Sequence, residues 1–345
     1  MNIKVLGIDL AKNVFQLCAL LEDGSMGWNR KAPRLKLLDK VRQLPSGTLI
    51  AMEACASAHY WGRTFMAMGF QVKLIPAQDV KPFVRCQKND AHDALAICEA
   101  AFRPSIHSVA VKSVEQQDIK ALRCVRRRLV EQRTAISNQL RGLAAEYGVI
   151  FPQGILKLQQ ALPEALGDAE NGLSHIARDL LYGLHDEIRL LNNEVDTITA
   201  QIIQLCKQQP RYKALLSVPG FGPIIAAALL SEVGTGEQFS NGRQLSAWCG
   251  LVPSQYSSGG KTRLGSITKH GNRELRTLLI HGARAVIRFA ENRKDDMGRW
   301  LMQLIERRGK KKAIVALANK LTRIAWCILN RQESFDARLA FKPLQ

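Results

Sequence analysis

Four acidic residues near the N-terminus are spaced as a metal-dependent nuclease would need them. Asp9 ends one apolar run and Glu53 follows a second, while Asp90 and Asp93 open a stretch of helical character. Two strand ends and one helix face can bring these carboxylates together around Mg²⁺, which prefers oxygen ligands. Two such ions, about 3.5–4 Å apart, clamp the attacking and leaving oxygens of a phosphodiester. The pattern therefore predicts chemistry on nucleic acid.

The aspartate pair also has a purely structural interpretation. On a helix, Asp90 and Asp93 are about 300° apart, which is about 60° the short way round, so both can face a sheet. Asp90 is also well placed to cap a helix over residues 91–101, and Asp93 would interact favourably with the helix dipole. With Asp9 and Glu53 at strand ends, metal ligation is the better interpretation. The sequence predicts a site of four carboxylates.

Composition agrees with a polyanionic substrate. The 345 residues carry a formal net charge of +19, and excess positive charge speeds the encounter with nucleic acid. The alternative is a generic basic protein, such as a ribosome-associated factor. A protein that only bound phosphate would avoid acids in its cleft unless a metal neutralised them, so the carboxylates argue against that alternative.

Other classes of protein are not indicated. No stretch reaches the roughly 18 apolar residues of a membrane span, and the N-terminus lacks the features of a signal peptide. The eight cysteines form no Cys-x-x-Cys pair, and several lie in apolar runs that predict buried thiols: Cys18, Cys98, Cys206 and Cys327. We expect a reducing, cytoplasmic compartment, no zinc site and no membrane partner.

Residues 1–112 predict an α/β domain. Apolar runs and turn residues indicate three strands that pair in antiparallel fashion, followed by alternation of helix and strand. This is the order of a ribonuclease-H-like fold, which places acids at adjacent strand ends. The expected strands cover 4–8, 14–20, a segment from 24, 48–52 and 71–75, and the expected helices cover 35–44, 57–68 and 91–101.

Residues 113–208 predict a helical hairpin. Apolar stripes indicate long helices over about 114–147 and 172–207, joined by a turn or short-helix region. The simplest interpretation is a scaffold arm; the sharper ones are a subunit-pairing surface and a face that grips nucleic acid, and we expect both uses. The cations assigned to the solvent face of the first helix are Arg123, Arg126, Arg127, Arg128 and Arg133.

Residues 209–330 predict a mostly helical domain, with a tail over 331–345 that we expect to be poorly ordered. Gly220 and Gly222 look like part of a helix-hairpin-helix, in which backbone amides approach phosphate, although a plain packing corner has the same pattern. A Gly/Ser loop follows, containing Ser257 and Ser258. That loop could hold a nucleophilic serine or act as a passive phosphate clamp; its neighbouring cations are Lys261, Arg263, Lys269, Arg273 and Arg276.

Seven segments form a recognisable set of motifs. In the first half these are residues 7–12, 52–61 and 88–94, and in the second half 218–223, 250–253, 258–261 and 267–272. Together they resemble the DEDD transposases of the bacterial insertion-sequence-110 family. They occur in the family's order along nearly the whole chain, which makes the resemblance specific. Ala56 stands where a glycine is common, and we expect this to affect only the turn.

The resemblance implies a RuvC-like domain, a coiled-coil arm and a transposase domain with a catalytic serine. It implies one or two Mg²⁺ ions at Asp9, Glu53, Asp90 and Asp93. The serine before the glycine pair is Ser258, with Ser257 beside it. Family members form tetramers and use a structured bridge RNA that pairs with donor and target DNA. Besides the basic sets above, we expect Lys12 and Lys88, which lie within the motifs, to contact nucleic acid.

The sequence thus predicts an RNA-guided DNA recombinase. Mg²⁺ would polarise the scissile phosphate, and Ser258 would displace the sugar hydroxyl and conserve the bond energy for rejoining. One alternative is a junction nuclease in which activated water cuts and no covalent intermediate forms. The other is a nucleic-acid-binding scaffold with an inactive site.

Overall fold

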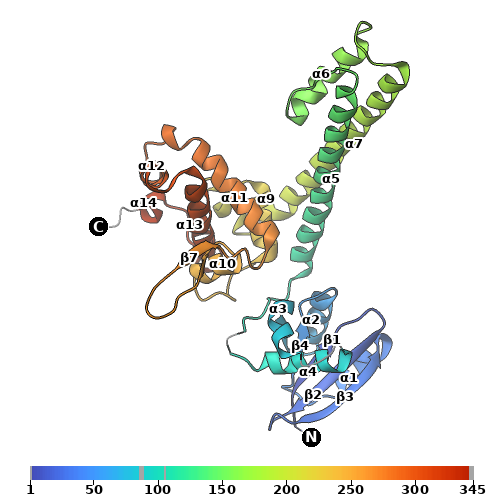
Figure 1. The fold of residues 1–345 in the computed structure, drawn as a ribbon. Helices are drawn as coiled ribbons and strands as arrows, with labels where there is room; N and C mark the ends of the chain where they lie inside the picture. Colours follow the sequence, from blue (N-terminus) through green and yellow to red (C-terminus); the bar gives the residue numbers. More distant parts are fainter. Residues whose placement is uncertain (1, 85–88, 105, 342–345) are drawn as a thin grey trace. The chain divides into compact units, whose positions relative to one another are not determined.

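The computed structural model describes residues 2–84, 89–104 and 106–341 and contains two compact units (Figure 1). Unit 1 comprises Met1–Val114 with the short segment Gly236–Ser240. Unit 2 comprises Glu115–Thr235 and Asn241–Gln345.

A five-stranded sheet forms the centre of unit 1. Its strands lie in the order β3-β2-β1-β4-β5. β2 is antiparallel to both β1 and β3, whereas β4 is parallel to both β1 and β5. This mixed sheet confirms the predicted order of strands and is consistent with a ribonuclease-H-like domain. The strands are β1 Ile3–Asp9, β2 Val14–Leu21, β3 Met26–Pro33, β4 Leu49–Glu53 and β5 Gln71–Ile75.

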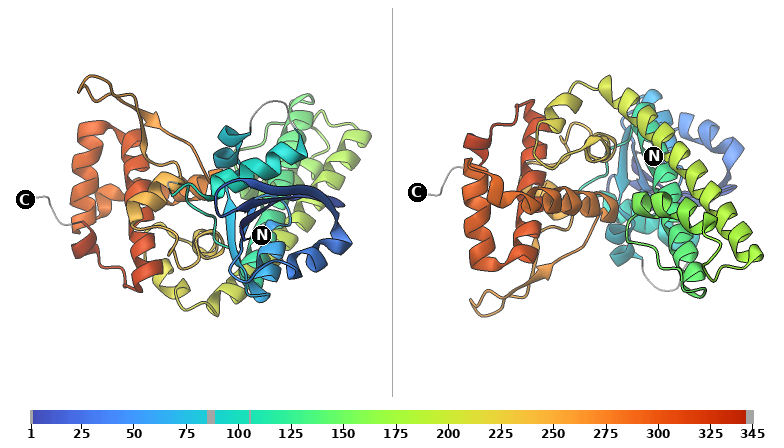
Figure 2. Two further views of the ribbon diagram at one scale, coloured as in Figure 1. Left: turned by 90° about the horizontal axis from the view of Figure 1, so that it is seen from below. Right: turned by 90° about the horizontal axis from the view of Figure 1, so that it is seen from above.

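Both faces of this sheet are covered, because alternate residues of a strand point to opposite sides. Leu17 and Met52 belong to a core shared with Trp61 of α2. Their neighbours Cys18 and Ala51 belong to a second core that includes residues of α4. Figure 2 shows the sheet of unit 1 among its helices. The helices of unit 1 are α1 Leu37–Arg42, α2 Ala58–Ala67, α3 Ala77–Val80 and α4 Asp90–Ala101, with 3₁₀ turns at Arg34–Lys36 and Lys81–Phe83.

Unit 2 begins with two long helices, α5 Val114–Ala145 and α7 His175–Lys207, which lie side by side (Figure 1). Hydrogen bonds from Arg126 to Thr199 and from Arg133 to Asn192 fix them as antiparallel. The helical hairpin is therefore present, and α6 Ile155–Gly167 occupies its tip. The apolar stripe of α7 was expected to begin at Ile176, but this residue is 73% exposed. Ala177 and Leu181 face the core instead.

The rest of unit 2 is mostly helical, as predicted, but it contains elements that the sequence did not indicate: α10, the hairpin β6–β7, α12 and, in the tail, α14. The elements are α8 Tyr212–Leu216, α9 Pro223–Glu232, α10 Gly242–Trp248, β6 Pro253–Gln255, β7 Leu264–Ile267, α11 Arg273–Arg288, α12 Asp296–Arg308, α13 Lys310–Arg331 and α14 Ala337–Ala340.

The C-terminal tail differs from expectation. The tail was expected to be poorly ordered, yet α14 forms there, and Phe341 is 1% exposed with its ring 5.4 Å from that of Trp300. The apolar contact explains the order. α13 is long and apolar enough, by length and composition alone, to cross a membrane, but half of the qualifying window is buried inside the protein, as in a core helix.

Candidate active site

Asp9 and Glu53 lie at the same edge of the sheet. β1 and β4 are parallel neighbours in which Ile8 pairs with Met52. Each acid is the next residue, and the last, of its strand. Because parallel strands end at a common edge, the two carboxylates come from adjacent backbone positions, as the sequence predicted.

Gly7 allows α4 to approach this edge. A Cβ atom at Gly7 would lie 2.6 Å from the carbonyl oxygen of Ala94 and 2.5 Å from Sγ of Cys98. Both neighbours belong to α4, so only glycine permits the observed packing of that helix against β1. The close approach carries the first turn of α4, with Asp90 and Asp93, to the end of β1.

Three of the four predicted acids form one compact group. Ligand oxygens of Asp9, Asp90 and Asp93 all lie within 4.8 Å of one another. Glu53 is outside that group but lines the same open cleft, which has a volume of 710 Å³ and also contains Lys81. An all-oxygen donor set of this kind fits a hard divalent cation. Without a cation, the clustered carboxylates would repel one another.

Asn89, not Asp90, caps α4. The Asn89 side chain accepts a hydrogen bond from the backbone amide of Ala91 at 3.0 Å, and Asp90 is the first residue of the helix. The expectation that Asp90 caps the helix is therefore wrong, because an amide oxygen one residue earlier takes that role. The carboxylate of Asp90 is left for the cleft.

Two polar residues that the sequence reasoning missed connect the strands to α4. Gln16 lies opposite Asp9 in the β1–β2 register, is 6% exposed and donates to the side-chain oxygen of Asn29. Asn29 in turn donates to the carbonyl of Ala91 at 2.8 Å. In the described part of the chain, the buried Oε1 of Gln16 has no hydrogen-bond partner. A buried glutamine within an apolar strand was the available signal, since burial of an unpaired amide is costly.

The turn after Glu53 places a thiol near the acids. The left-handed residue of this turn is Ser57, with φ of 68°, rather than Ala56, where the family commonly has glycine. Burial raises the pKa of the Cys55 thiol, and the negative charges of Glu53 and Asp9 raise it further. The thiol thus lies in the field of both strand-end carboxylates, which disfavours its thiolate form.

In unit 2, Ser258 lies on a tight exposed turn. Lys261 donates its backbone amide to the Ser258 carbonyl at 3.1 Å, and the two glycines between them have φ of 55° and 76°. Two positive φ values are typical of a type I′ turn, which suits a two-residue hairpin loop. The hydroxyl of Ser257 accepts a hydrogen bond from Gln255 at 2.8 Å. The chain therefore presents Ser258 at the first position of a β-hairpin turn.

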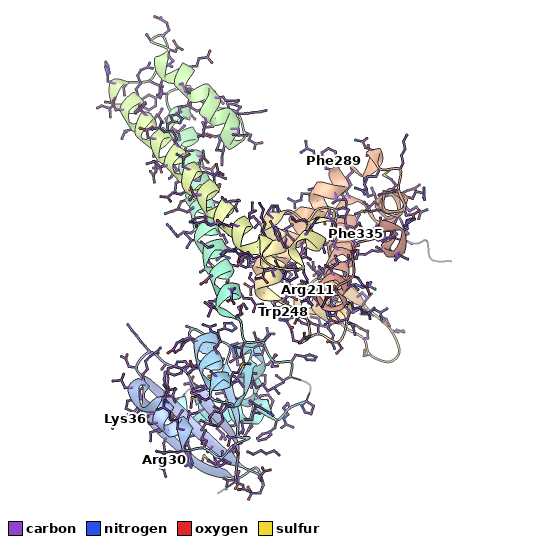
Figure 3. All side chains as sticks on the ribbon, turned by 180° about the vertical axis from the view of Figure 1, so that it is seen from behind. Arg30, Lys36, Arg211, Trp248, Phe289 and Phe335 are labelled. Atoms are coloured by element: carbon purple, nitrogen blue, oxygen red, sulfur yellow. The ribbon has the colours of Figure 1, made fainter. Side chains whose placement is uncertain are left out.

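The base of this hairpin is held by buried contacts. A Cβ atom at Gly271 would lie 1.9 Å from the carbonyl oxygen of Trp248, a residue labelled in Figure 3, so the loop before α11 packs closely against the end of α10. Arg276 is 8% exposed and donates to the carbonyls of Cys249 at 3.0 Å and His270 at 2.9 Å. We predicted that Arg276 contacts phosphate, but its guanidinium is used to join the loops beneath the hairpin.

Arg123 is also buried, contrary to its assignment to the solvent face of α5. It is 3% exposed and forms ion pairs with Glu232 at 3.5 Å and Glu274 at 2.7 Å. These carboxylates come from α9 and α11, so the arginine fixes the first long helix to the rest of unit 2. A buried arginine that is paired twice has its charge compensated and is not available to phosphate.

The other predicted phosphate contacts have mixed environments. A Cβ at Gly220 would lie 2.6 Å from the Gly282 carbonyl, which favours a packing corner there, whereas Gly222 has open space at the start of α9. Arg127 is half exposed but pairs with Glu274, and Arg126 bonds Thr199. Lys88 lies outside the described residues. The predicted cations that are exposed are Lys12, Arg128, Lys261, Arg263, Lys269 and Arg273.

Two families of known proteins match parts of this chain. The family described as "Transposase IS116/IS110/IS902 family" matches residues 212–297, and the IS110 DEDD family, described as "Transposase", matches residues 6–149. A probable family 20 transposase of Pseudomonas aeruginosa is 45% identical over 336 residues, which cover 97% of this chain and 99% of that protein. The chain belongs to the IS110 transposase family.

Two further relatives agree with this assignment. The transposase for insertion sequence element IS1111A of Coxiella burnetii is 44% identical, over 97% of this chain and 92% of the relative. A pilin gene-inverting protein of Moraxella lacunata is 29% identical over 166 residues, or 45% of this chain and 49% of that protein. This transposase therefore cuts and rejoins DNA, and its DEDD domain with the acidic group implies the use of a divalent metal.

Proposed function

We propose that this transposase is an RNA-guided DNA recombinase that uses Mg²⁺ and a serine nucleophile. The observation that carries the proposal is the presence of two complementary chemical sites. One is a compact group of carboxylates at Asp9, Asp90 and Asp93, with Glu53 in the same cleft. The other is Ser258, on an exposed turn next to Lys261.

The residues have distinct roles in this scheme. Asp9, Glu53, Asp90 and Asp93 would hold Mg²⁺, which supplies charge neutralisation and polarisation of the scissile phosphate. Oγ of Ser258 forms a bond to phosphorus while the bond from phosphorus to the sugar oxygen breaks. The serine proton ends on the departing sugar hydroxyl. Attack by a second sugar hydroxyl on the phosphoserine link reverses these steps and rejoins the DNA, so no external energy source is needed.

Ser258 is a better nucleophile candidate than Ser257. The Ser257 hydroxyl is engaged by Gln255. Among the described residues, no hydrogen bond is recorded for the Ser258 hydroxyl, and its backbone closes the turn with Lys261. Lys261 and Arg263 on the same hairpin can stabilise the negative charge that develops on the phosphate during attack.

The proposed partners follow from the resemblance and from the basic surface. They are double-stranded donor and target DNA, a structured noncoding bridge RNA and further copies of the chain, in a tetramer paired through a coiled-coil arm. We also propose a RuvC-like domain at 1–112, the arm at 113–208 and a transposase domain at 209–330, acting in the cytoplasm on the nucleoid. The proposed nucleic-acid contacts are Lys12, Arg126, Arg127, Arg128, Gly222, Lys261, Arg263, Lys269 and Arg273.

Trapping a covalent protein–DNA adduct tests this proposal. A nicked DNA substrate that cannot be rejoined should accumulate the adduct in Mg²⁺, and mass spectrometry should place the phosphate on Ser258. Ser258→Ala should abolish the adduct, whereas the matched variant Ser257→Ala should retain it. Cleavage without any adduct in the wild type would favour the water-dependent junction nuclease. Recombination that proceeds without RNA from the element would contradict RNA guidance.

A further inference from the structure

A pocket in the C-terminal part of unit 2 is lined by four cations and has no role in the scheme above. It has a volume of 470 Å³ and lies between α13, the start of α10 and α14. Its cations are Arg243, Lys320, Arg323 and Arg331, and no carboxylate is among its described lining residues. The acid cleft and the serine hairpin are formed by other residues.

One face of α13 builds the main wall. Lys320, Arg323 and Arg331 are spaced by three and then eight residues, with Ile324 and Cys327 between them. At 3.6 residues per turn, these positions form a single stripe. The stripe therefore combines cationic heads with apolar side chains, which is a surface suited to a ligand that is both anionic and partly apolar.

The start of α10 forms the opposite wall and is fixed against α13 by backbone contact. A Cβ atom at Gly242 would lie 2.9 Å from Cα of Arg323, so glycine is required for this approach. Asn241 caps α10 by accepting hydrogen bonds from the amides of Arg243 and Gln244. The position of Arg243 beside Arg323 is thus set by helix packing rather than by a mobile loop.

The charges of this pocket are not balanced within the described chain. No ion pair is recorded for Arg243, Lys320 or Arg323 in the regions that the structure describes, and Arg331 pairs only with the exposed Glu333 at 3.8 Å. Burial lowers the pKa of Lys320, and the positive charge of Arg323 lowers it further. By contrast, the buried Arg123 has two carboxylates. Cations that repel one another around a cavity gain most from a bound anion.

Lys320 is held in place although it lacks a carboxylate. Its Nζ lies 4.8 Å from the ring centre of Trp300 and 4.5 Å from that of Phe341. Cation–π contacts of this kind attract an ammonium group without neutralising it. The aromatic pair therefore positions the lysine at the wall while leaving its charge for a ligand.

We propose that this pocket binds a phosphodiester group of nucleic acid, at a point separate from the site of strand cleavage. The guanidinium groups of Arg243 and Arg323 would contact the phosphate, for which their geometry is suited, and Ile324 and Cys327 would contact the adjoining sugar. Such a contact positions the nucleic acid without reading its sequence. The inference uses the family's action on DNA but does not depend on Ser258 or on a guide RNA.

Salt dependence of binding is the first test. Arg323→Gln and Arg243→Gln should each lower the slope of log affinity against log salt, by about 0.9 for duplex DNA or about 0.7 for single strands. The matched control is Arg308→Gln, an exposed arginine at the end of α12 outside the pocket, which should leave the slope unchanged. Equal slopes in the wild type and the three variants, with unchanged thermal unfolding, would overturn the proposal.

Protection of Cys327 from alkylation is the second test, because this partly buried thiol lines the pocket and Cys124 on α5 serves as the reference. Short duplex DNA or hairpin RNA should protect Cys327 but not Cys124, and Arg323→Gln should weaken that protection. Stronger protection by DNA or by RNA identifies the source of the phosphodiester. Equal protection by a free nucleoside monophosphate would replace the proposal with a small-ligand site.

The two proposals can fail independently. Ser258→Ala protein should show the same protection of Cys327 as the wild type. Protection without any covalent adduct in the wild type would leave the pocket in place and reject the serine mechanism. A covalent adduct without protection of Cys327 would support the serine mechanism and reject the pocket as a phosphodiester site.

Discussion

The acid cleft and the serine hairpin are built in opposite ways. The carboxylates come from two strands and a helix that pack on a sheet covered on both faces. Ser258 stands on an exposed two-residue turn, which is joined to the domain by the short strand pair β6–β7 and a bridge between Ser258 and Lys261. Metal ligands must be positioned before the substrate arrives, since an ion tolerates little error in geometry. A nucleophile can instead be placed by the substrate that it attacks, so an exposed turn is sufficient.

The largest effect should come from removing one charge in the cleft. Asp9→Asn and Asp93→Asn keep the side-chain volume but lose a negative oxygen ligand, so DNA cleavage should fall below detection while the fold persists. Asp39→Asn is the matched control, because Asp39 is exposed on α1 and pairs with Arg42 at 2.9 Å. Strand-transfer assays in Mg²⁺ and circular dichroism measure both properties. Near-normal activity in both cleft variants would show that these acids do not hold the metal.

The hydrogen bonds that link Gln16, Asn29 and the Ala91 carbonyl should contribute less to activity than the acids of the cleft. Asn29→Ala removes the hydrogen bonds to Gln16 and to the Ala91 carbonyl. Groups that orient metal ligands typically contribute about 10–100-fold to metal affinity or activity. The Mg²⁺ concentration needed for half-maximal activity should therefore rise within that range. An unchanged Mg²⁺ requirement, with lower thermal stability alone, would limit Asn29 to a structural role.

The acid cleft and the serine hairpin also differ in how far the sequence could predict them. The strand order and the acids at the ends of β1 and β4 follow from apolar runs, because a covered sheet leaves a strong periodic signal. Gln16 and Asn29 were missed because their partners are distant in sequence. The hairpin was seen only as a Gly/Ser loop, since β6 and β7 are too short to show alternation. Arg123 and Arg276 were misassigned because sequence gives the charge of an arginine but not the acids or carbonyls that meet it.

Substitutions of two arginines near the hairpin should distinguish a residue that stabilises the fold from one that binds nucleic acid. Arg276→Ala removes charge-assisted hydrogen bonds to two carbonyls. Each is worth about 1.5–3 kcal/mol, so the free energy of unfolding should fall by about 3–6 kcal/mol. Its salt slope should not change. Arg273→Ala, at the exposed start of α11, should show the reverse: unchanged stability and a slope lower by about 0.7–0.9. Denaturant unfolding and filter binding distinguish the two, and a lower slope for Arg276→Ala would restore it as a phosphate contact.

The smallest effects should come from substitutions of Gly259, the first glycine of the turn. They test whether adduct formation at Ser258 depends only on the conformation of that turn. Gly259 has φ of 55°, and nothing lies within 4 Å of a Cβ placed there. Gly259→Asn would create Asn-Gly, the preferred type I′ pair, so adduct formation should stay within about twofold because the turn is preserved.

Gly259→Val has the same open space but a β-branched side chain, and the left-handed conformation costs such residues at least about 1–2 kcal/mol. It should therefore slow adduct formation by about tenfold, one factor of ten for each 1.4 kcal/mol, without changing the melting temperature of the cleft unit. Equal rates for both variants would show that the turn is remodelled on binding, whereas a large loss in Gly259→Asn would mean that the backbone itself must approach the phosphate.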